Sequence, residues 1–185
     1  MAQSKILVDT NSYLRLAKPL QPFLFEPFGG AEYCLYVIPE LNSELASRHL
    51  KTKFPWIDQP EFVEERRHFP TMSRQQRRAI EETFLFVWSH VETDLPGPSR
   101  VDARYVAYAL ELDIPAVTDD EDMIQLAKAF GAGVMRTLDL LKIMVEQNHI
   151  DMRKVRSIVA YWRHIDDAPG QLAKHYRRLF GGHPP

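Results

Sequence analysis

Apolar residues follow two patterns along the chain, which together predict alternating strands and helices. Residues 5–9 and 33–38 are near-continuous apolar runs, typical of parallel strands covered on both faces. Shorter runs at 115–118 and 133–136 predict two more strands. Between these runs, apolar residues return every three or four positions, as they do on one face of a helix. The alternation predicts an α/β fold with a central parallel sheet of about four to five strands.

Prolines, glycines and capping residues predict where the helices begin and end. Pro39 is placed to open a helix that continues to Leu50, and Pro60 another that runs to Phe69. Gly131 is placed to end the helix before it. The later helix starts are indicated by Ser73 with Gln76, Ser99 with Asp102, Thr137, Asp151 and Pro169.

Length and composition bound the domain organisation. With 185 residues, 45% of them hydrophobic, the chain can bury one sizeable core. We predict one α/β domain over residues 1–148, with a helical insertion at about 57–93, and a C-terminal helical hairpin at 149–185. The apolar stripe of the hairpin is expected to pack on its own domain rather than on another protein.

Charge and cysteine content narrow the setting of the protein. The net charge of −2 and a pI near 6.4 argue against indiscriminate binding to polyanions. Cys34 is the single cysteine, so an internal disulfide is excluded, and no signal-like segment opens the chain. No stretch reaches the roughly 20 apolar residues of a membrane span. We therefore expect a cytoplasmic protein with no membrane partner.

Acidic residues stand at four places where strands are predicted to end or helices to begin. They are Asp9, Glu44, Asp102 and Asp120. Open parallel sheets gather their ligands at the carboxyl ends of the strands. Carboxylates brought together there would repel unless protons or cations neutralised them. The pattern therefore predicts a site for a divalent metal ion.

Each acid also has a local explanation. Asp9 is suited to cap the turn that follows it, and a capping box alone accounts for Asp102. Glu40 lies one turn from Glu44, and either could be a solvated helix residue. In the run 119–122, acids at a helix start are favoured by the helix dipole regardless of function.

Four short segments, taken in order, resemble the signatures of PIN-domain nucleases, with a spacing similar to that of the small bacterial toxins of the VapC type. The segments are Ile6–Asn11, Ile38–Pro39 with Glu44–Leu45, Asp102–Ala103 with Ala107 and Ala109, and Thr118–Asp120 with Asp122. The resemblance covers about residues 4 to 146. It implies a PIN-like three-layer sandwich.

The resemblance implies a metal-dependent ribonuclease that hydrolyses RNA phosphodiester bonds with Mg²⁺ or Mn²⁺. Asp9 and Asp102 would contact the metal most directly, and Glu44 and Asp120 would complete the site. The supporting residues would be Thr10, Asn11, Thr118 and Asp122. The family usually has a small polar residue where this chain has Asp119, so Asp120 is our choice in this run and Asp122 the alternative.

The resemblance also implies partners. They are an RNA substrate, an antitoxin protein that restrains the enzyme and, because related PIN toxins commonly dimerise, a second copy of the chain. The C-terminal hairpin departs from the compact toxins, and the sequence does not indicate its target.

Basic residues on one predicted helix offer a surface for RNA. Arg74, Arg77 and Arg78 share a helix face and could neutralise phosphates. The alternative is a solvated face on which they pair with Glu81 and Glu82.

Two other functions compete with the ribonuclease. In a phosphatase of the haloacid-dehalogenase type, Asp9 would be a covalent nucleophile and Asp119 with Asp120 would hold Mg²⁺. That chemistry requires a second Asp two residues after the nucleophile, where this chain has Asn11. The other alternative is a non-catalytic module that binds nucleic acid or protein.

Overall fold

The chain folds around a four-stranded parallel sheet, as predicted. A computed structural model describes residues 3–185. The strands are β1 (Ser4–Val8), β2 (Tyr33–Tyr36), β3 (Ala116–Val117) and β4 (Val134–Met135). Their order across the sheet is β2-β1-β3-β4, and every neighbouring pair is parallel.

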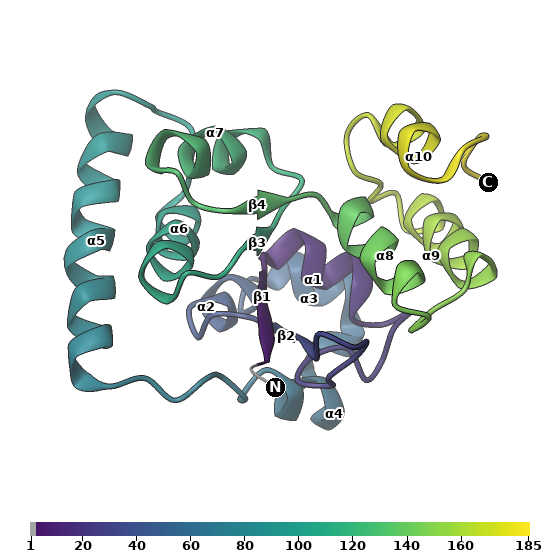
Figure 1. The fold of residues 1–185 in the computed structure, drawn as a ribbon, viewed down its shortest axis with the longest axis horizontal. Helices are drawn as coiled ribbons and strands as arrows, with labels where there is room; N and C mark the ends of the chain where they lie inside the picture. Colours follow the sequence, from purple (N-terminus) through teal and green to yellow (C-terminus); the bar gives the residue numbers. More distant parts are fainter. Residues whose placement is uncertain (1–2) are drawn as a thin grey trace.

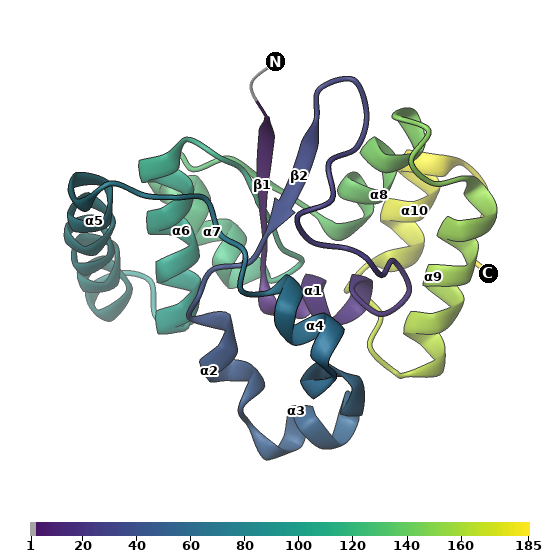
Figure 2. The ribbon, with the colours of Figure 1, turned by 90° about the horizontal axis from the view of Figure 1, so that it is seen from below.

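Helices cover both faces of the sheet and produce three layers (Figures 1 and 2). One face carries α5 (Arg74–Thr93), α6 (Arg100–Leu112) and α7 (Glu121–Phe130). The other carries α1 (Thr10–Leu16), α8 (Thr137–Glu146), α9 (Met152–His164) and α10 (Leu172–Phe180). Successive side chains of a strand point to opposite faces of the sheet, which explains this division. Ile6 and Val8 pack with α1, α8 and α9, whereas Leu7 packs with α5, α6 and α7.

Four short helices connect β2 to α5. They are α2 (Leu41–Leu45), α3 (Arg48–Lys53), the 3₁₀ turn η1 (Pro55–Asp58) and α4 (Pro60–Glu65). In Figure 2 they lie beneath the sheet, beside α1. They place Glu44 and Leu50 near the carboxyl end of β1.

The strand order creates a crevice between β1 and β3. From β1 the chain moves outward to β2, and it later returns to the opposite side of β1 to form β3 and then β4. The connections leaving β1 and β3 therefore diverge, and a crevice opens where the order reverses. Asp9 follows β1 directly, and Asp120 follows β3 by three residues.

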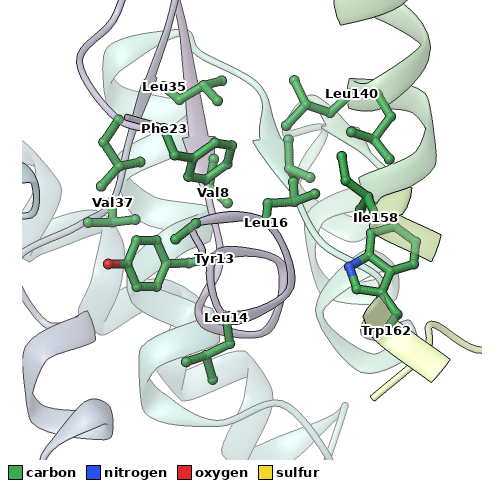
Figure 3. Packing of buried hydrophobic residues seen from close by; sticks show 14 of the residues in the cluster. Val8, Tyr13, Leu14, Leu16, Phe23, Leu35, Val37, Leu140, Ile158 and Trp162 are labelled. Carbon is green, nitrogen blue, oxygen red and sulfur yellow. The ribbon is translucent and has the colours of Figure 1, made fainter. Parts of the chain in front are cut away.

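The C-terminal helices pack on the sheet domain, as their apolar stripe predicted. Trp162 and Ile158 of α9 are fully buried with Leu16 of α1 and Leu140 of α8 (Figure 3). The indole Nε1 of Trp162 donates a 2.9 Å hydrogen bond to the Arg15 carbonyl. α10 packs against α8.

Several predicted helix boundaries are confirmed by hydrogen bonds. Ser73 with Gln76 and Ser99 with Asp102 both form reciprocal capping boxes. The Asp151 carboxylate accepts from the Lys154 amide at 2.8 Å. Gly131 ends α7 with φ of +74°, a conformation that favours glycine.

The single helix predicted from Pro39 to Leu50 is wrong. The structure has two helices, separated at Ser47, whose ψ of 135° is extended and whose hydroxyl accepts from the Leu50 amide. The Ser47 side chain caps a new helix within a segment whose apolar spacing is that of one continuous helix. The apolar spacing alone does not reveal such an interruption.

Three other boundaries also differ from the prediction. The helix from Pro60 stops at Glu65 rather than Phe69, and the Arg66 side chain that follows it donates to the Tyr13 hydroxyl and the Ile57 carbonyl. The N-cap position of α8 is held by Arg136 rather than Thr137, and the Arg136 amide donates to the Asp139 carboxylate at 3.0 Å. α10 begins at Leu172, three residues after Pro169. Among the described residues, no helix is long and apolar enough to cross a membrane.

Candidate functional site

The four acids singled out in the sequence line one hollow at the crevice between β1 and β3. This acidic hollow has a volume of about 250 Å³. It is lined by Asp9, Thr10, Asn11, Glu44, Leu50, Ser99, Asp102, Tyr105 and Asp120. These residues come from α1, α2, α3, the start of α6 and the start of α7. Folding therefore brings together side chains that are far apart in the sequence.

Asp9 lies at the base of the acidic hollow and is held in place by two donors. Its side chain is 4% exposed. Oδ1 accepts from the Ser12 amide at 2.7 Å, which caps α1, and Oδ2 accepts from the Thr118 hydroxyl at 2.6 Å. A carboxylate oxygen has two lone pairs, so both oxygens keep one acceptor position. Asp9 is thus both a helix cap and a hollow-lining residue.

Glu44 is oriented by the residue that follows Asp9. The Thr10 hydroxyl donates to the Glu44 carboxylate. Glu40 instead lies near Arg104, at 3.9 Å, and does not line the acidic hollow. Of the two glutamates left open by the sequence, Glu44 is therefore the one placed at the hollow.

Asp102 and Asp120 stand at the starts of two helices that converge on the acidic hollow. Asp102 Oδ2 accepts from the Ser99 amide at 2.6 Å, completing the capping box of α6. Asp120 Oδ1 accepts from the amides of Asp122 and Met123 at 2.8 and 3.0 Å. Its own amide donates to the Thr118 hydroxyl at 3.0 Å. Thr118 thus links Asp120 to Asp9.

Asp119 points away from the acidic hollow. Its Oδ2 lies 3.0 Å from Arg15 Nη1 and accepts from the Thr137 hydroxyl at 2.5 Å. Oδ1 accepts from the Thr137 amide at 3.2 Å. Both oxygens are therefore occupied by interactions that hold the β3–α7 connection. This leaves Asp120 as the hollow-lining acid of the run.

Two sets of predicted residues lie outside the lining. Asp122 is exposed, and a Cβ at Gly97 would lie 2.9 Å from its carboxyl carbon, so it faces the loop before α6. Arg74, Arg77 and Arg78 are exposed on α5 and do not line the acidic hollow. Arg78 pairs with Glu82 at 2.7 Å.

Burial dominates the acid–base properties of the acidic hollow. Burial raises the pKa of Asp9 from 3.8 to about 6, with a smaller contribution from repulsion by Asp119, against the opposing effect of hydrogen bonds from Ser12 and Thr118. Burial first, and then neighbouring acids, also raise the pKa values of Glu44 and Asp102. The charged forms of Asp9, Glu44 and Asp102 are therefore disfavoured, a cost that a bound cation would relieve.

The raised pKa of Asp9 predicts how stability depends on pH. The folded protein binds the proton of the Asp9 carboxyl more tightly than the unfolded chain does. The stability that this group contributes is therefore fully present below about pH 4 and is lost as the pH rises through about 6. In metal-free buffer, the free energy of unfolding of Asp9→Asn should rise by about 3 kcal/mol relative to that of the wild type as the pH is raised through this window. Urea unfolding of both proteins at several pH values measures the difference. A difference that does not change with pH would contradict the prediction.

Leu50, Ser99 and Tyr105 are lining residues that the sequence did not assign to the site. Tyr105 is 1% exposed. Its hydroxyl has no hydrogen-bond partner among residues 3–185. Burial, with repulsion from Asp9 and Glu44, raises its pKa well above the ordinary value, so the hydroxyl keeps its proton. The helical period places Tyr105 on a buried face but does not reveal the unpartnered hydroxyl.

Removing that hydroxyl should not destabilise the protein. Because it makes no hydrogen bond, Tyr105→Phe is expected to leave the free energy of unfolding unchanged or to raise it by up to about 1 kcal/mol in metal-free buffer. Tyr36→Phe is the matched control, since the Tyr36 hydroxyl donates to Gln3 Oε1 at 2.6 Å and its loss should cost about 1 kcal/mol. Urea unfolding tests both, and a loss at Tyr105 as large as at Tyr36 would show a hidden partner.

The carboxylate oxygens of the acidic hollow are suitable ligands for a hard, hydrated cation. Within residues 3–185, no three His, Cys, Asp or Glu side chains are already arranged to hold a metal ion. The four carboxylates instead surround a space far larger than one water requires. Mg²⁺ and Mn²⁺ favour oxygen ligands, and Mg²⁺ keeps several waters when it binds to protein. The chemistry of the residues present therefore suits such an ion with some carboxylates acting through water.

Comparisons with known proteins add a distant structural likeness. No family model and no curated protein matches the sequence. The fold is similar to a crystal structure of FitAcB from Neisseria gonorrhoeae, with a TM-score of 0.43 and 16% identity, covering 72% of this chain and 98% of that one. The function is therefore argued from the site itself.

Proposed function

We propose that this protein is a metal-dependent endoribonuclease that hydrolyses RNA phosphodiester bonds. Asp9, Glu44, Asp102 and Asp120 would hold Mg²⁺ or Mn²⁺. The observation that carries the proposal is the convergence of these four acids, from separate elements, on one hollow at the carboxyl ends of β1 and β3. The resemblance of the same residues to PIN-domain signatures supports it.

The chain's own residues have distinct parts in this proposal. Bound in the acidic hollow, the cation would activate water and stabilise charge on the phosphate. Ser12 and Thr118 fix the rotamer of Asp9, and Thr10 fixes that of Glu44. Asn11 is exposed at the rim, where its amide can donate to a phosphate oxygen.

The geometry gives the phosphatase alternative less support. That chemistry needs a second Asp two residues after the nucleophile, and Asn11 stands at this position on the rim of the acidic hollow. Asp119, which would hold Mg²⁺ with Asp120, is engaged by Arg15 and Thr137. Formation of an aspartyl-phosphate would nevertheless favour that chemistry over the ribonuclease.

A cleavage assay tests the proposal. Purified protein should cut single-stranded RNA when Mn²⁺ or Mg²⁺ is added, and EDTA should stop the reaction. RNA binding without any cleavage under these conditions would favour the non-catalytic module instead.

The wider proposal is that the protein is the toxin of a toxin–antitoxin pair. Its support is the resemblance of the sequence to VapC-type toxins. A small neighbouring reading frame that encodes a DNA-binding fold with a tail, and whose product inhibits cleavage, would support this role. Cleavage that no neighbouring product inhibits would favour a housekeeping nuclease.

A further inference from the structure

The C-terminal helices carry a charge opposite to that of the rest of the chain. Residues 149–185 contain seven Lys and Arg but three Asp and Glu, a net charge of +4, whereas the preceding residues have a net charge of −6. Two of these three acids have partners, Asp151 at the exposed start of α9 and Asp167 in the loop after it. Asp151 caps α9, and Asp167 pairs with Arg15 and Lys53. The positive charge is therefore left on the outer surface.

The outer face of α9 concentrates this charge in one stripe. At 100° per residue, Arg153, Arg156 and Arg163 lie within one sector of about 80°, with Arg153 opposite the buried face and Arg156 and Arg163 along its edge beside Val159. All three arginines are exposed, and α9 stands at the outer edge of the molecule (Figures 1 and 2). Among the described residues, only Arg153 of the three has an acidic partner, Asp151 at 2.9 Å. The stripe extends over roughly 15 Å.

The loop after α9 connects this stripe to the acidic hollow. Asp167 accepts from Arg15 through its backbone carbonyl at 2.9 Å and lies 3.2 Å from Lys53 Nζ. Arg15 belongs to α1, whose first turn lines the hollow, and it also pairs with Asp119, the neighbour of Asp120. Lys53 belongs to α3, which contributes Leu50 to the lining. The end of α9 that carries Arg163 thus adjoins the elements of the site.

We propose that the outer face of α9 binds the phosphate backbone of the RNA substrate and guides the strand toward the acidic hollow. The proposal rests on the proposed function for the identity of the ligand. Arg156 and Arg163, for which no acidic partner is found among the described residues, suit phosphates, which arginines contact without reading sequence. Without a bound cation the four carboxylates of the hollow repel phosphate, so a cationic surface outside the hollow helps to hold the strand. On α5, Arg78 is already paired with Glu82 at 2.7 Å, which leaves Arg74 and Arg77 as the comparison pair.

The test compares charge reversals on the two basic helices. Binding of a labelled single-stranded RNA to the full chain is measured by fluorescence anisotropy in EDTA, which prevents cleavage. Arg156→Glu with Arg163→Glu should weaken binding roughly tenfold and lower the slope of log affinity against log salt by about 1.4. Arg74→Glu with Arg77→Glu makes the same charge change on α5 and should weaken binding less. Thermal melts check folding, and Arg156→Ala with Arg163→Ala provides a milder pair.

The outcomes separate this proposal from the proposed function. Wild-type affinity in the α9 variants, an equal or larger loss in the α5 variant, or no RNA binding by the wild type would overturn the α9 surface. If the wild type cleaves RNA and the α9 variants bind RNA normally, the proposed ribonuclease function is supported and the proposed α9 surface is contradicted. If the wild type binds RNA through α9 but never cleaves it, the proposed α9 surface is supported and the proposed ribonuclease function is contradicted.

Discussion

Asp9→Asn is expected to lower metal-dependent RNA cleavage by at least about a hundredfold, because changes in residues that merely support a metal ligand already cost 10- to 100-fold. The amide keeps an oxygen to accept from Ser12 and places an NH₂ group against the Thr118 hydroxyl, which can also accept. The fold should therefore survive while the charge at the base of the acidic hollow is lost. Initial rates of cleavage at saturating Mn²⁺ measure the effect.

Asp113→Asn is the matched control for this substitution. It makes the same chemical change at the opposite end of α6 from Asp102. Asp113 has φ of 52°, a left-handed conformation that asparagine tolerates well. Cleavage by this variant should stay within about twofold of the wild type, since exposed changes away from a site usually have small effects. A folded Asp9→Asn protein that cleaves as fast as the Asp113→Asn control would remove Asp9 from the mechanism.

The assembly of the acidic hollow could be predicted because strand order and chemistry agree. Asp9 and Asp120 follow predicted parallel strands, and the carboxyl ends of parallel strands meet at one edge of the sheet. Asp102 could be explained by its capping box alone, and the structure shows that it both caps α6 and lines the hollow. The hydrogen bond that caps α6 therefore also orients the Asp102 carboxylate at the hollow, so the two roles are compatible.

What the sequence could not predict depended on long-range side-chain contacts. Asp119 and Asp120 are neighbours with the same side chain, and only the positions of Arg15 and Thr137 decide which of them turns away from the hollow. The sequence predicted that Thr137 caps α8, but its hydroxyl donates to Asp119 and the residue stands inside the helix as its first member. Local patterns carry no information about a residue 104 positions away. The cationic face of α9 was missed for a different reason, since its apolar stripe indicated only which side is buried.

Trp162→Ala should destabilise the whole protein by about 3–5 kcal/mol, the usual cost of removing a buried large aromatic side chain. Trp162 is fully buried among residues of α1 and α8, and its indole satisfies the Arg15 carbonyl (Figure 3). The substitution leaves both a cavity and an unpaired acceptor. Urea unfolding followed by far-ultraviolet circular dichroism measures the change in free energy.

Leu85→Ala provides the comparison, because Leu85 is a large apolar residue that is 57% exposed on α5 and should change stability by no more than about 0.5 kcal/mol. If the C-terminal helices were an independent appendage, Trp162→Ala would melt them first and leave a second transition at the wild-type midpoint. A single transition shifted as a whole is expected instead, since α9 shares its core with β1 and α1. Because α1 begins at the acidic hollow, loss of this core contact should also disturb the positions of Thr10 and Asn11. The C-terminal helices would then be required to build the site as well as to present a surface beside it.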